Sequence, residues 1–165
     1  MNQPKSSNRT PIPPTVKIGE LRNNLSYLSR LVRVITMQSG SEYFEKFDFA
    51  SGQKTMLYLI SINNEITQNE LANALVMKKS QVTNLIADLV ERKLVIRETH
   101  EGDRRFNTLR LTAEGTRVCK KLEAQMSMHG AHLGSPLSSQ ELNQLTTLLS
   151  KLLKTHLSDS GIDFQ

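Results

Sequence analysis

The chain has 165 residues, of which 38% are hydrophobic, and its formal net charge is +5 at pH 7. This length and apolar content suffice for one domain with a hydrophobic core and exclude a chain too polar to fold. No apolar run is long enough to span a bilayer and no secretory core is recognisable, so we expect a cytoplasmic protein without a membrane partner. The lone cysteine, Cys119, excludes an internal disulfide.

The first residues differ in composition from the rest of the chain. Residues 1–16 hold four of the five prolines, with Ser, Asn and Gln between them, and we expect a disordered arm there. From Lys17, apolar residues recur at intervals of three and four, which predicts a helix over residues 17–40 with one apolar seam. The seam begins with Ile18, Leu21, Leu25 and Leu28.

Most of the aromatic side chains follow this helix. Core packing is the favoured role for this cluster, which consists of Tyr43, Phe44, Phe47 and Phe49. A second helix is predicted from about Ser51, and three of its apolar residues, Met56, Leu57 and Ile60, fall on one inward face.

The segment from Ile66 to Gly115 has the order of a winged helix-turn-helix. A short helix opens at Thr67, which forms a capping box with Glu70. After the turn at residues 76–78, a second helix places its apolar residues on one face. Its other face is polar and carries Lys79, Ser80, Gln81, Thr83 and Asn84, preceded by Lys78.

This polar face suits a major groove, which admits one α-helix. Gln81 and Asn84 carry amides that can bond adenine in two places, and Ser80 and Thr83 can bond phosphates or base edges. Lys78 and Lys79 can neutralise phosphates. The alternative is an ordinary solvated helix face.

A basic hairpin follows the second helix. Residues 95–99 and 108–111 alternate apolar and polar side chains, which predicts two half-buried strands. The tip of the hairpin that connects them is formed by Asp103, Arg104 and Arg105. Arginines on an extended ribbon can contact phosphates or enter a narrow minor groove, and Asp103 can orient a guanidinium. A solvated hairpin tip is the alternative here.

Two more helices are predicted beyond the hairpin. The first contains Cys119, for which burial as a small hydrophobe is the expected role. The second opens with a capping box of Ser138 and Glu141 and continues with a broad leucine stripe. Such a stripe can cover a core within the chain. Because two apolar helices flank a unit that occupies only the middle of the chain, we favour a dimer interface built from both. It would include Ile18, Leu21, Leu25 and Leu28 of the first helix and Leu145, Leu149 and Leu152 of the last.

These motifs resemble the MarR family of bacterial transcription regulators over roughly residues 17–157. The resemblance rests on Thr67-Gln-Asn-Glu-Leu-Ala, on Ser80-Gln-Val-Thr-Asn-Leu-Ile, on residues 89–97 and on the stretch from Gly102 to Gly115. In that last stretch Asp103 and Arg105 match the family's Asp-x-Arg wing tip. Leu111, Thr112 and Gly115 match its Leu-Thr-x-x-Gly. The chain departs from the family at Lys93, where a glycine is usual.

The resemblance implies a mainly helical fold with a small β-hairpin wing. A MarR-like domain would cover residues 17–165, with a DNA-binding lobe at 50–111 and dimerisation helices at 17–40 and 112–157. It implies a homodimeric regulator, most often a repressor in this family, which binds double-stranded DNA at a pseudo-palindromic operator. Thr67 and Gln68, at the start of the first short helix, join the candidate DNA contacts.

The family binds small aromatic acids, phenols or drug-like compounds between its dimerisation helices and its winged-helix lobe. The resemblance therefore implies a small-molecule effector, with Tyr27, Arg30, Arg33 and Phe44 as candidate contacts. Arginine can hold a carboxylate and aromatic rings can line such a pocket. Core packing for the aromatics and solvation for each arginine are the stronger alternatives.

No enzyme, cofactor or metal site is expected. The sequence has no phosphate loop, no Gly-x-Ser-x-Gly and no His-Glu-x-x-His. His129 and His132 could share a helix face and serve a metal-responsive regulator, but two imidazoles without a carboxylate or thiolate make a poor site. A different alternative is a protein-interaction module in which Lys79 and Arg105 contact acidic partners.

Overall fold

The computed structural model describes residues 16–63, 65–99 and 107–157. All but the last residue of the predicted arm at 1–16 lies outside these ranges, as does the predicted hairpin tip at 103–105. The chain divides into two compact units, residues 1–38 and 39–165.

The prediction of one helix over residues 17–40 is wrong. A 3₁₀ helix, η1 (Gly19–Asn23), comes first, and the α-helix α1 (Leu25–Phe44) follows and continues into the second unit. Asn24 separates the two with an extended backbone, and its Oδ1 accepts a hydrogen bond from the Tyr27 N–H at 2.9 Å. Asparagine is a preferred N-cap, so α1 begins after it. Ile18 and Leu21 therefore precede the helix that their spacing predicted.

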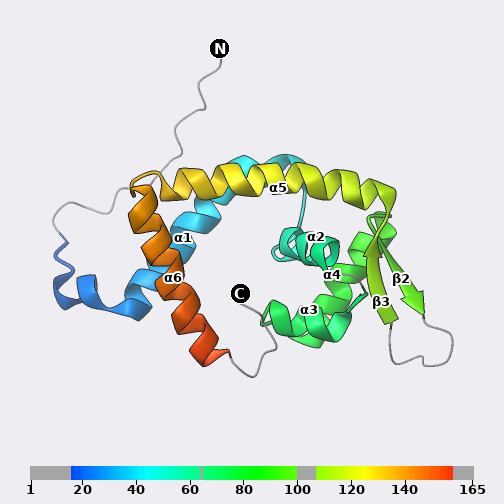
Figure 1. The fold of residues 1–165 in the computed structure, drawn as a ribbon, viewed down its shortest axis with the longest axis horizontal. Coiled ribbons are helices and arrows are strands. Elements are labelled where there is room, and N and C mark those ends of the chain that lie inside the picture. The colour runs from blue at the N-terminus through cyan, green and yellow to red at the C-terminus, as the bar shows by residue number, and fades with distance from the viewer. Residues whose placement is uncertain (1–15, 64, 100–106, 158–165) are drawn as a thin grey trace, which may run out of the picture. The chain divides into compact units, whose positions relative to one another are not determined.

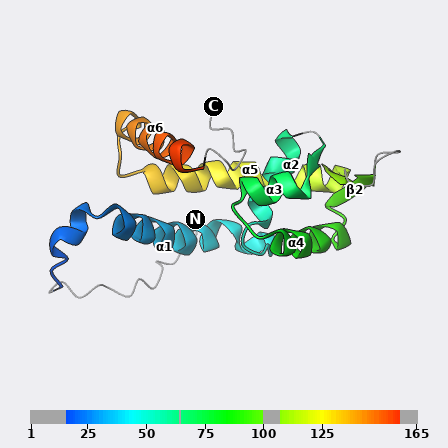
Figure 2. The same ribbon diagram turned by 90° about the horizontal axis from the view of Figure 1, so that it is seen from below.

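The second unit contains the other elements, shown as a ribbon in Figure 1. In chain order they are η2 (Glu45–Phe47), α2 (Gln53–Ile62), β1 (Ile66–Thr67), α3 (Gln68–Ala74), α4 (Lys79–Glu91), β2 (Val95–Thr99), β3 (Asn107–Leu111), α5 (Ala113–Gly134) and α6 (Ser139–His156). Figures 1 and 2 show α2, α3, α4 and the strands gathered where α5 begins, while α6 starts at the other end of α5. The mainly helical class with a small β-wing is confirmed.

The strands form one antiparallel sheet in the order β1-β3-β2. Val95 pairs with Leu111 in the hairpin that the sequence predicted, and β3 starts one residue earlier than expected. Ile66 pairs with Leu109, which adds β1 as an edge that the sequence analysis missed. The two residues of β1 are too few for an alternating pattern, and their partner is distant along the chain.

The hydrophobic core lies in the middle of the chain. All buried hydrophobic side chains among the described residues fall between positions 56 and 122: Met56, Leu57, Ile60, Ile66, Leu71, Ala72, Val82, Ile86, Leu89, Leu94, Val95, Leu109, Cys119 and Leu122. The inward face predicted for α2 is confirmed. Phe44, Phe47 and Phe49 are half-buried and contact this cluster, which agrees with their expected packing role.

Hydrogen bonds fix the start of α5 against the segment that directly follows α4. The Thr112 hydroxyl caps α5 by accepting from the Gly115 N–H at 2.9 Å and donates to the Lys93 carbonyl at 2.7 Å. The Thr112 N–H donates to the Leu94 carbonyl at 3.0 Å. A Cβ on Gly115 would collide with that same carbonyl. The Thr-x-x-Gly pattern thus has a packing reason, because only glycine lets α5 approach this closely.

The long terminal helices contribute little to this core. No residue of α6 is buried, and the only buried residue of α1 is Gly40. Leu148 of α6 is 64% exposed and Leu25 of α1 is 55% exposed. Within the described residues, no helix is long and apolar enough to cross a membrane.

Candidate nucleic-acid interface

The helix pair α3 and α4 is built by local signals. The Thr67 hydroxyl accepts from the Glu70 N–H at 3.2 Å, and the Glu70 carboxylate accepts from the Thr67 N–H at 2.7 Å, which confirms the predicted capping box. The turn after α3 closes with a hydrogen bond from the Met77 N–H to the Ala72 carbonyl at 2.9 Å. Val76 in this turn has a positive φ of 51°. A β-branched residue is strained in that conformation, so the turn is held by its surroundings.

The two faces of α4 differ sharply. Val82, Ile86 and Leu89 are fully buried on the inner face. All the polar residues expected to contact DNA from this helix are exposed: Lys78, Lys79, Ser80, Gln81, Thr83 and Asn84. Figure 2 shows α4 along an outer edge of the second unit. The structure therefore brings these six residues onto one accessible surface.

Hydrogen bonds distinguish the members of that face. Gln81 Oε1 accepts from the Lys78 N–H at 3.3 Å and so helps to cap α4, while Thr83 Oγ1 donates to the Lys79 carbonyl at 2.9 Å. Among the described residues, no hydrogen bond engages the side chain of Ser80 or Asn84. Asn84 is thus an amide on this face whose donors and acceptor are all available for a base edge.

The candidates at the start of α3 have a different setting. The Thr67 hydroxyl also donates to Glu70 Oε2 at 2.8 Å, so the cap already occupies it. Gln68, the next residue, is half-buried. Thr67 is therefore first of all a helix cap.

The described part of the wing carries its own charges. Arg110 on β3 and Glu98 on β2 form an ion pair with a nitrogen–oxygen distance of 3.0 Å, and Arg97 is exposed on β2. The candidates Asp103, Arg104 and Arg105 lie outside the described residues.

Comparison with known proteins adds to this geometry. The sequence profile of the MarR family matches residues 47–105. The uncharacterized HTH-type transcriptional regulator YhbI of Bacillus subtilis is 30% identical over 110 residues, which are 67% of this chain and 71% of YhbI. The chain belongs to the MarR family. It is thus a DNA-binding transcription regulator of the MarR type, and proteins of this family are not enzymes.

Solved structures of the MarR family have a similar fold. The crystal structure of S. aureus MepR in complex with DNA superposes with a TM-score of 0.71 at 28% identity, covering 79% of this chain and 97% of MepR. MarR of E. coli without ligand gives a TM-score of 0.66 at 25% identity, covering 78% of this chain and 96% of that protein.

The departure from the MarR pattern at Lys93 has a structural consequence. Lys93 follows α4 and has a φ of 57°, in the left-handed region that favours glycine. The backbone corner that the family usually makes with glycine is therefore kept here by a lysine, at the expense of strain.

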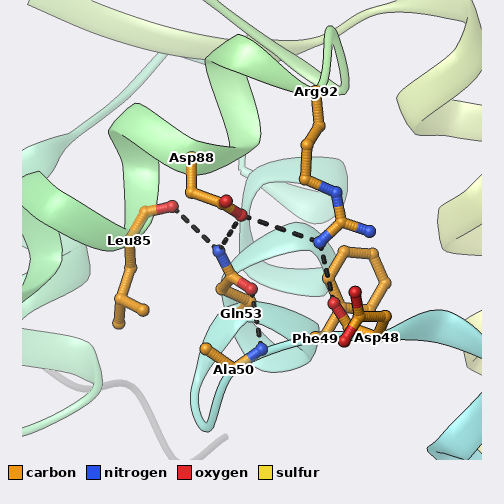
Figure 3. A pocket seen from close by; sticks show the side chains of 7 residues that line it. All are labelled: Asp48, Phe49, Ala50, Gln53, Leu85, Asp88 and Arg92. Carbon is orange, nitrogen blue, oxygen red and sulfur yellow. Dashed lines mark hydrogen bonds and ion pairs between the residues drawn. The ribbon is translucent and has the colours of Figure 1, made fainter.

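The sequence analysis did not predict a polar cluster that joins α2 to α4. Figure 3 shows the pocket that it lines, with a volume of about 730 Å³. The pocket is lined by residues from the segment before α2, from α2, from α4 and from the residue that follows α4: Asp48, Phe49, Ala50, Gln53, Leu85, Asp88 and Arg92. The signal available in the sequence was Gln53, a glutamine at the start of a helix whose middle, residues 56–60, is mainly apolar.

The candidate dimerisation residues of this MarR-family chain are exposed in both units. Ile18, Leu21, Leu25 and Leu28 belong to the first unit, and Leu145, Leu149 and Leu152 to the second. The effector candidates are also divided. Tyr27 is half-buried and Arg30 and Arg33 are exposed in the first unit, whereas Phe44 is half-buried in the second.

His129, which the sequence analysis considered with His132 as a metal pair, packs inside the second unit. It is buried, its Nε2 lies 2.8 Å from Ser39 Oγ, and its ring meets Phe44 edge-on. Burial lowers the pKa of His129, and the positive charges of Lys54 and His132 lower it further. Within the described residues, no three His, Cys, Asp or Glu side chains gather as a metal site requires. Cys119 is buried as expected, and burial raises the pKa of its thiol.

Proposed function

We propose that this protein is a homodimeric repressor that reads a pseudo-palindromic operator through α4. The observation that carries the proposal is the contrast across α4, whose inner face is fully buried while its polar outer face is exposed. A helix held in this way can enter a major groove without losing its packing. The two recognition helices of a dimer would then meet half-sites about one helical turn, roughly 10 base pairs, apart.

The roles of the DNA-reading residues follow from their chemistry. Asn84 and Ser80 are proposed to contact base edges, with Gln81 and Thr83 beside them. Lys78, Lys79, Arg104 and Arg105 are proposed to contact phosphates, with Asp103 orienting the wing arginines. Gln68 and Thr67 would lie at the edge of the interface. The lobe at 50–111 would read DNA, and parts of 17–40 and 112–157 would form the dimer.

The test of base reading is Asn84→Ala against Asn143→Ala. Asn143 is an exposed asparagine on α6, so it controls for loss of a helix-surface amide. On the DNA upstream of the protein's own gene, Asn84→Ala should weaken binding by about 1–3 kcal/mol, with little change on random DNA. Asn143→Ala should bind as wild type. Equal losses on both DNAs would reduce Asn84 to a positioning contact.

Phosphate contacts by the wing predict a different signature. Arg105→Ala should weaken binding to all sequences and lower the salt slope by about one per lost contact, with Arg104→Ala weaker in the same sense. Titrations at several salt concentrations measure both quantities. A folded double variant with unchanged affinity and slope would contradict the role of the wing. Salt-dependent, sequence-selective duplex binding also separates this function from a protein-interaction module.

The dimer is supported by the exposed apolar side chains of α1 and α6. Leu25→Asp with Leu28→Asp should abolish dimerisation, because the charges would be buried without partners. Ser26→Asp with Ser29→Asp adds the same charge at exposed serines of α1 and should leave the dimer intact. Light scattering followed by gel-shift titration measures both. A wild type that is monomeric at micromolar concentration would overturn the dimer and the palindrome with it.

A small aromatic acid is the proposed effector, acting in the cytoplasm. A carboxylate would be held by Arg30 or Arg33 and a ring by Tyr27, all of the first unit. A panel of aromatic acids added to the operator titration tests this, because an effector must shift the DNA affinity. The shift should disappear in Arg30→Ala with Arg33→Ala. A panel without any effect, or an undiminished shift in that variant, would contradict this assignment.

A further inference from the structure

The side chain of Gln53 links α2 to the second half of α4. It is the first residue of α2 and is 1% exposed. Its Oε1 accepts from the Ala50 N–H at 2.8 Å, and its Nε2 donates to the Leu85 carbonyl at 3.1 Å and to Asp88 Oδ2 at 2.6 Å (Figure 3). Both N–H donors and the oxygen of the carboxamide are thereby used. A buried amide is tolerated only when it is satisfied in this way.

Arg92 makes a second link at the end of α4. Its guanidinium donates to the carbonyls of Asp48 at 2.9 Å and Phe47 at 3.1 Å, and its carbon lies 4.4 Å from the centre of the Phe49 ring. The same guanidinium lies 3.6 Å from Asp88 Oδ2. The Asp88 carboxylate therefore accepts a hydrogen bond from Gln53 and forms an ion pair with Arg92, as Figure 3 shows.

These links restrain motions that apolar packing resists only weakly. Apolar contacts such as those of Leu89 oppose separation of the helices, but they are non-directional and so define the rotation of α4 about its axis less sharply than hydrogen bonds do. Hydrogen bonds have a narrow range of length and angle, so bonds to a backbone carbonyl of α4 and to a side chain one turn later oppose both this rotation and shifts along the axis. Leu85 directly follows Asn84, so its carbonyl shares the rotational setting of that residue.

We propose that Gln53 is a positioning residue for DNA reading, which acts through Leu85 and Asp88 to fix the rotation of α4 and hence the approach of Asn84 to a base edge. This inference rests on the proposed function, in which α4 reads the operator. Loss of the link would reduce binding to the operator more than binding to random DNA. The reason is that base contacts require an exact hydrogen-bond geometry, whereas phosphate contacts tolerate displacement.

The decisive variant is Gln53→Glu, which keeps the shape and replaces the donor by an acceptor. The ionised carboxylate would face Asp88 and the Leu85 carbonyl, and both would repel it. The other charged groups at this site are Arg92, directly after α4, and Asp48, before α2. When the new carboxyl is protonated, its O–H can donate to Asp88 again. Operator affinity should therefore be about tenfold below wild type at pH 8 and should recover toward wild type at pH 6.

A second substitution can restore the link with reversed polarity. In Gln53→Glu with Asp88→Asn, the new amide at position 88 can donate to the carboxylate at position 53. This double variant should bind the operator within about threefold of wild type at pH 8, without the recovery at low pH. Asp88→Asn alone keeps an acceptor for Gln53 and is the matched control, with affinity near that of wild type. If Gln53 only stabilised the fold, the operator affinity of folded protein would not fall in Gln53→Glu, and the double variant would have no lost affinity to restore.

Circular dichroism at each pH checks that the variants are folded. If Gln53→Glu unfolds, Gln53→Met takes its place. Methionine has a similar length and no strong donor or acceptor, so it should lower the ratio of operator to random-DNA affinity in folded protein. An unchanged ratio, or a folded Gln53→Glu variant with wild-type affinity at both pH values, would overturn the positioning role. Failure of the proposed function is separate, because wild type itself would then show no preference for the operator.

Discussion

The lobe around α2, α3, α4 and the sheet differs from α6 in how its apolar side chains are covered. In the lobe, Leu57, Leu71 and Leu89 are fully buried within one chain. In α6, Leu148 is 64% exposed, and no residue of that helix is buried. Both regions have an apolar stripe and a capping box, so helix signals do not distinguish them. The difference shows that the apolar side chains of the lobe are covered by other residues of the same chain, whereas α6 keeps an apolar face available for another surface.

The largest effect should come from Gly115→Ala. The added methyl group would collide with the Leu94 carbonyl, so α5 would have to move away from the lobe. We expect the free energy of unfolding to fall by about 3 kcal/mol or more. Gly130→Ala, in the same helix with no atom near the added group, should instead stabilise by up to about 1 kcal/mol. Urea unfolding measures both. A tolerated Gly115→Ala would show that the lobe is loosely assembled.

A direct comparison of the two regions uses one substitution in each. Leu89→Ala, at a fully buried position, should lower the free energy of unfolding by about 2–5 kcal/mol at every protein concentration. Leu149→Ala, at a position 41% exposed, should cost less than about 1 kcal/mol in dilute protein and more as concentration rises. Equal, concentration-independent losses would place Leu149 in a core of its own chain and abolish the contrast.

Lys93→Gly should increase the stability of the lobe, by a smaller amount. Glycine adopts the left-handed conformation of this corner without strain, although it also makes the unfolded chain more flexible. The net effect should be a stabilisation of about 0.5–1 kcal/mol. Lys93→Ala, which removes the same side chain but keeps a Cβ, should give no gain. Thermal unfolding of the two variants measures the difference between them, and equal stabilities would show that the corner is not strained.

The smallest effect, absent at neutral pH, concerns His129 on α5. Its pKa lies below the ordinary 6.5 because burial, then Lys54 and His132, disfavour the charged ring. The unfolded chain therefore binds a proton more readily, so this contribution to stability is complete above pH 6.5 and declines as the pH falls below it. His129→Gln, which can still bond Ser39, should show a shallower loss of stability between pH 7 and pH 5. An identical pH profile would indicate that His129 is not shielded in solution.

The sequence predicted the features that depend on near neighbours. Thr67 with Glu70 and Ser138 with Glu141 form both expected capping boxes, because each box needs only residues three apart. The buried and exposed faces of α4 also follow from its spacing. These local patterns also predicted that the polar residues of α4 are exposed. Their contacts with DNA remain predictions.

Features set by distant partners or by single polar residues were not predictable in the same way. The spacing of Ile18 and Leu21 continued the helical pattern, but the Asn24 cap starts α1 after them. The burial of Gln53 depends on Leu85 and Asp88, more than thirty positions away. Strand β1 exists only because Leu109 and Thr108 lie beside it. A pattern of apolar spacing contains no information on any of these three.

The pairing of β1 with β3 also bears on the order in which the chain folds. This ladder joins Ile66 to Leu109, and the loop that it closes contains both α3 and α4. The hairpin of β2 and β3 pairs residues close in sequence, so it can form early, whereas closing the larger loop carries a greater entropy cost. During synthesis, β1 has no partner until β3 has emerged. Helix α4 therefore acquires its final setting only after the hairpin that follows it has been made.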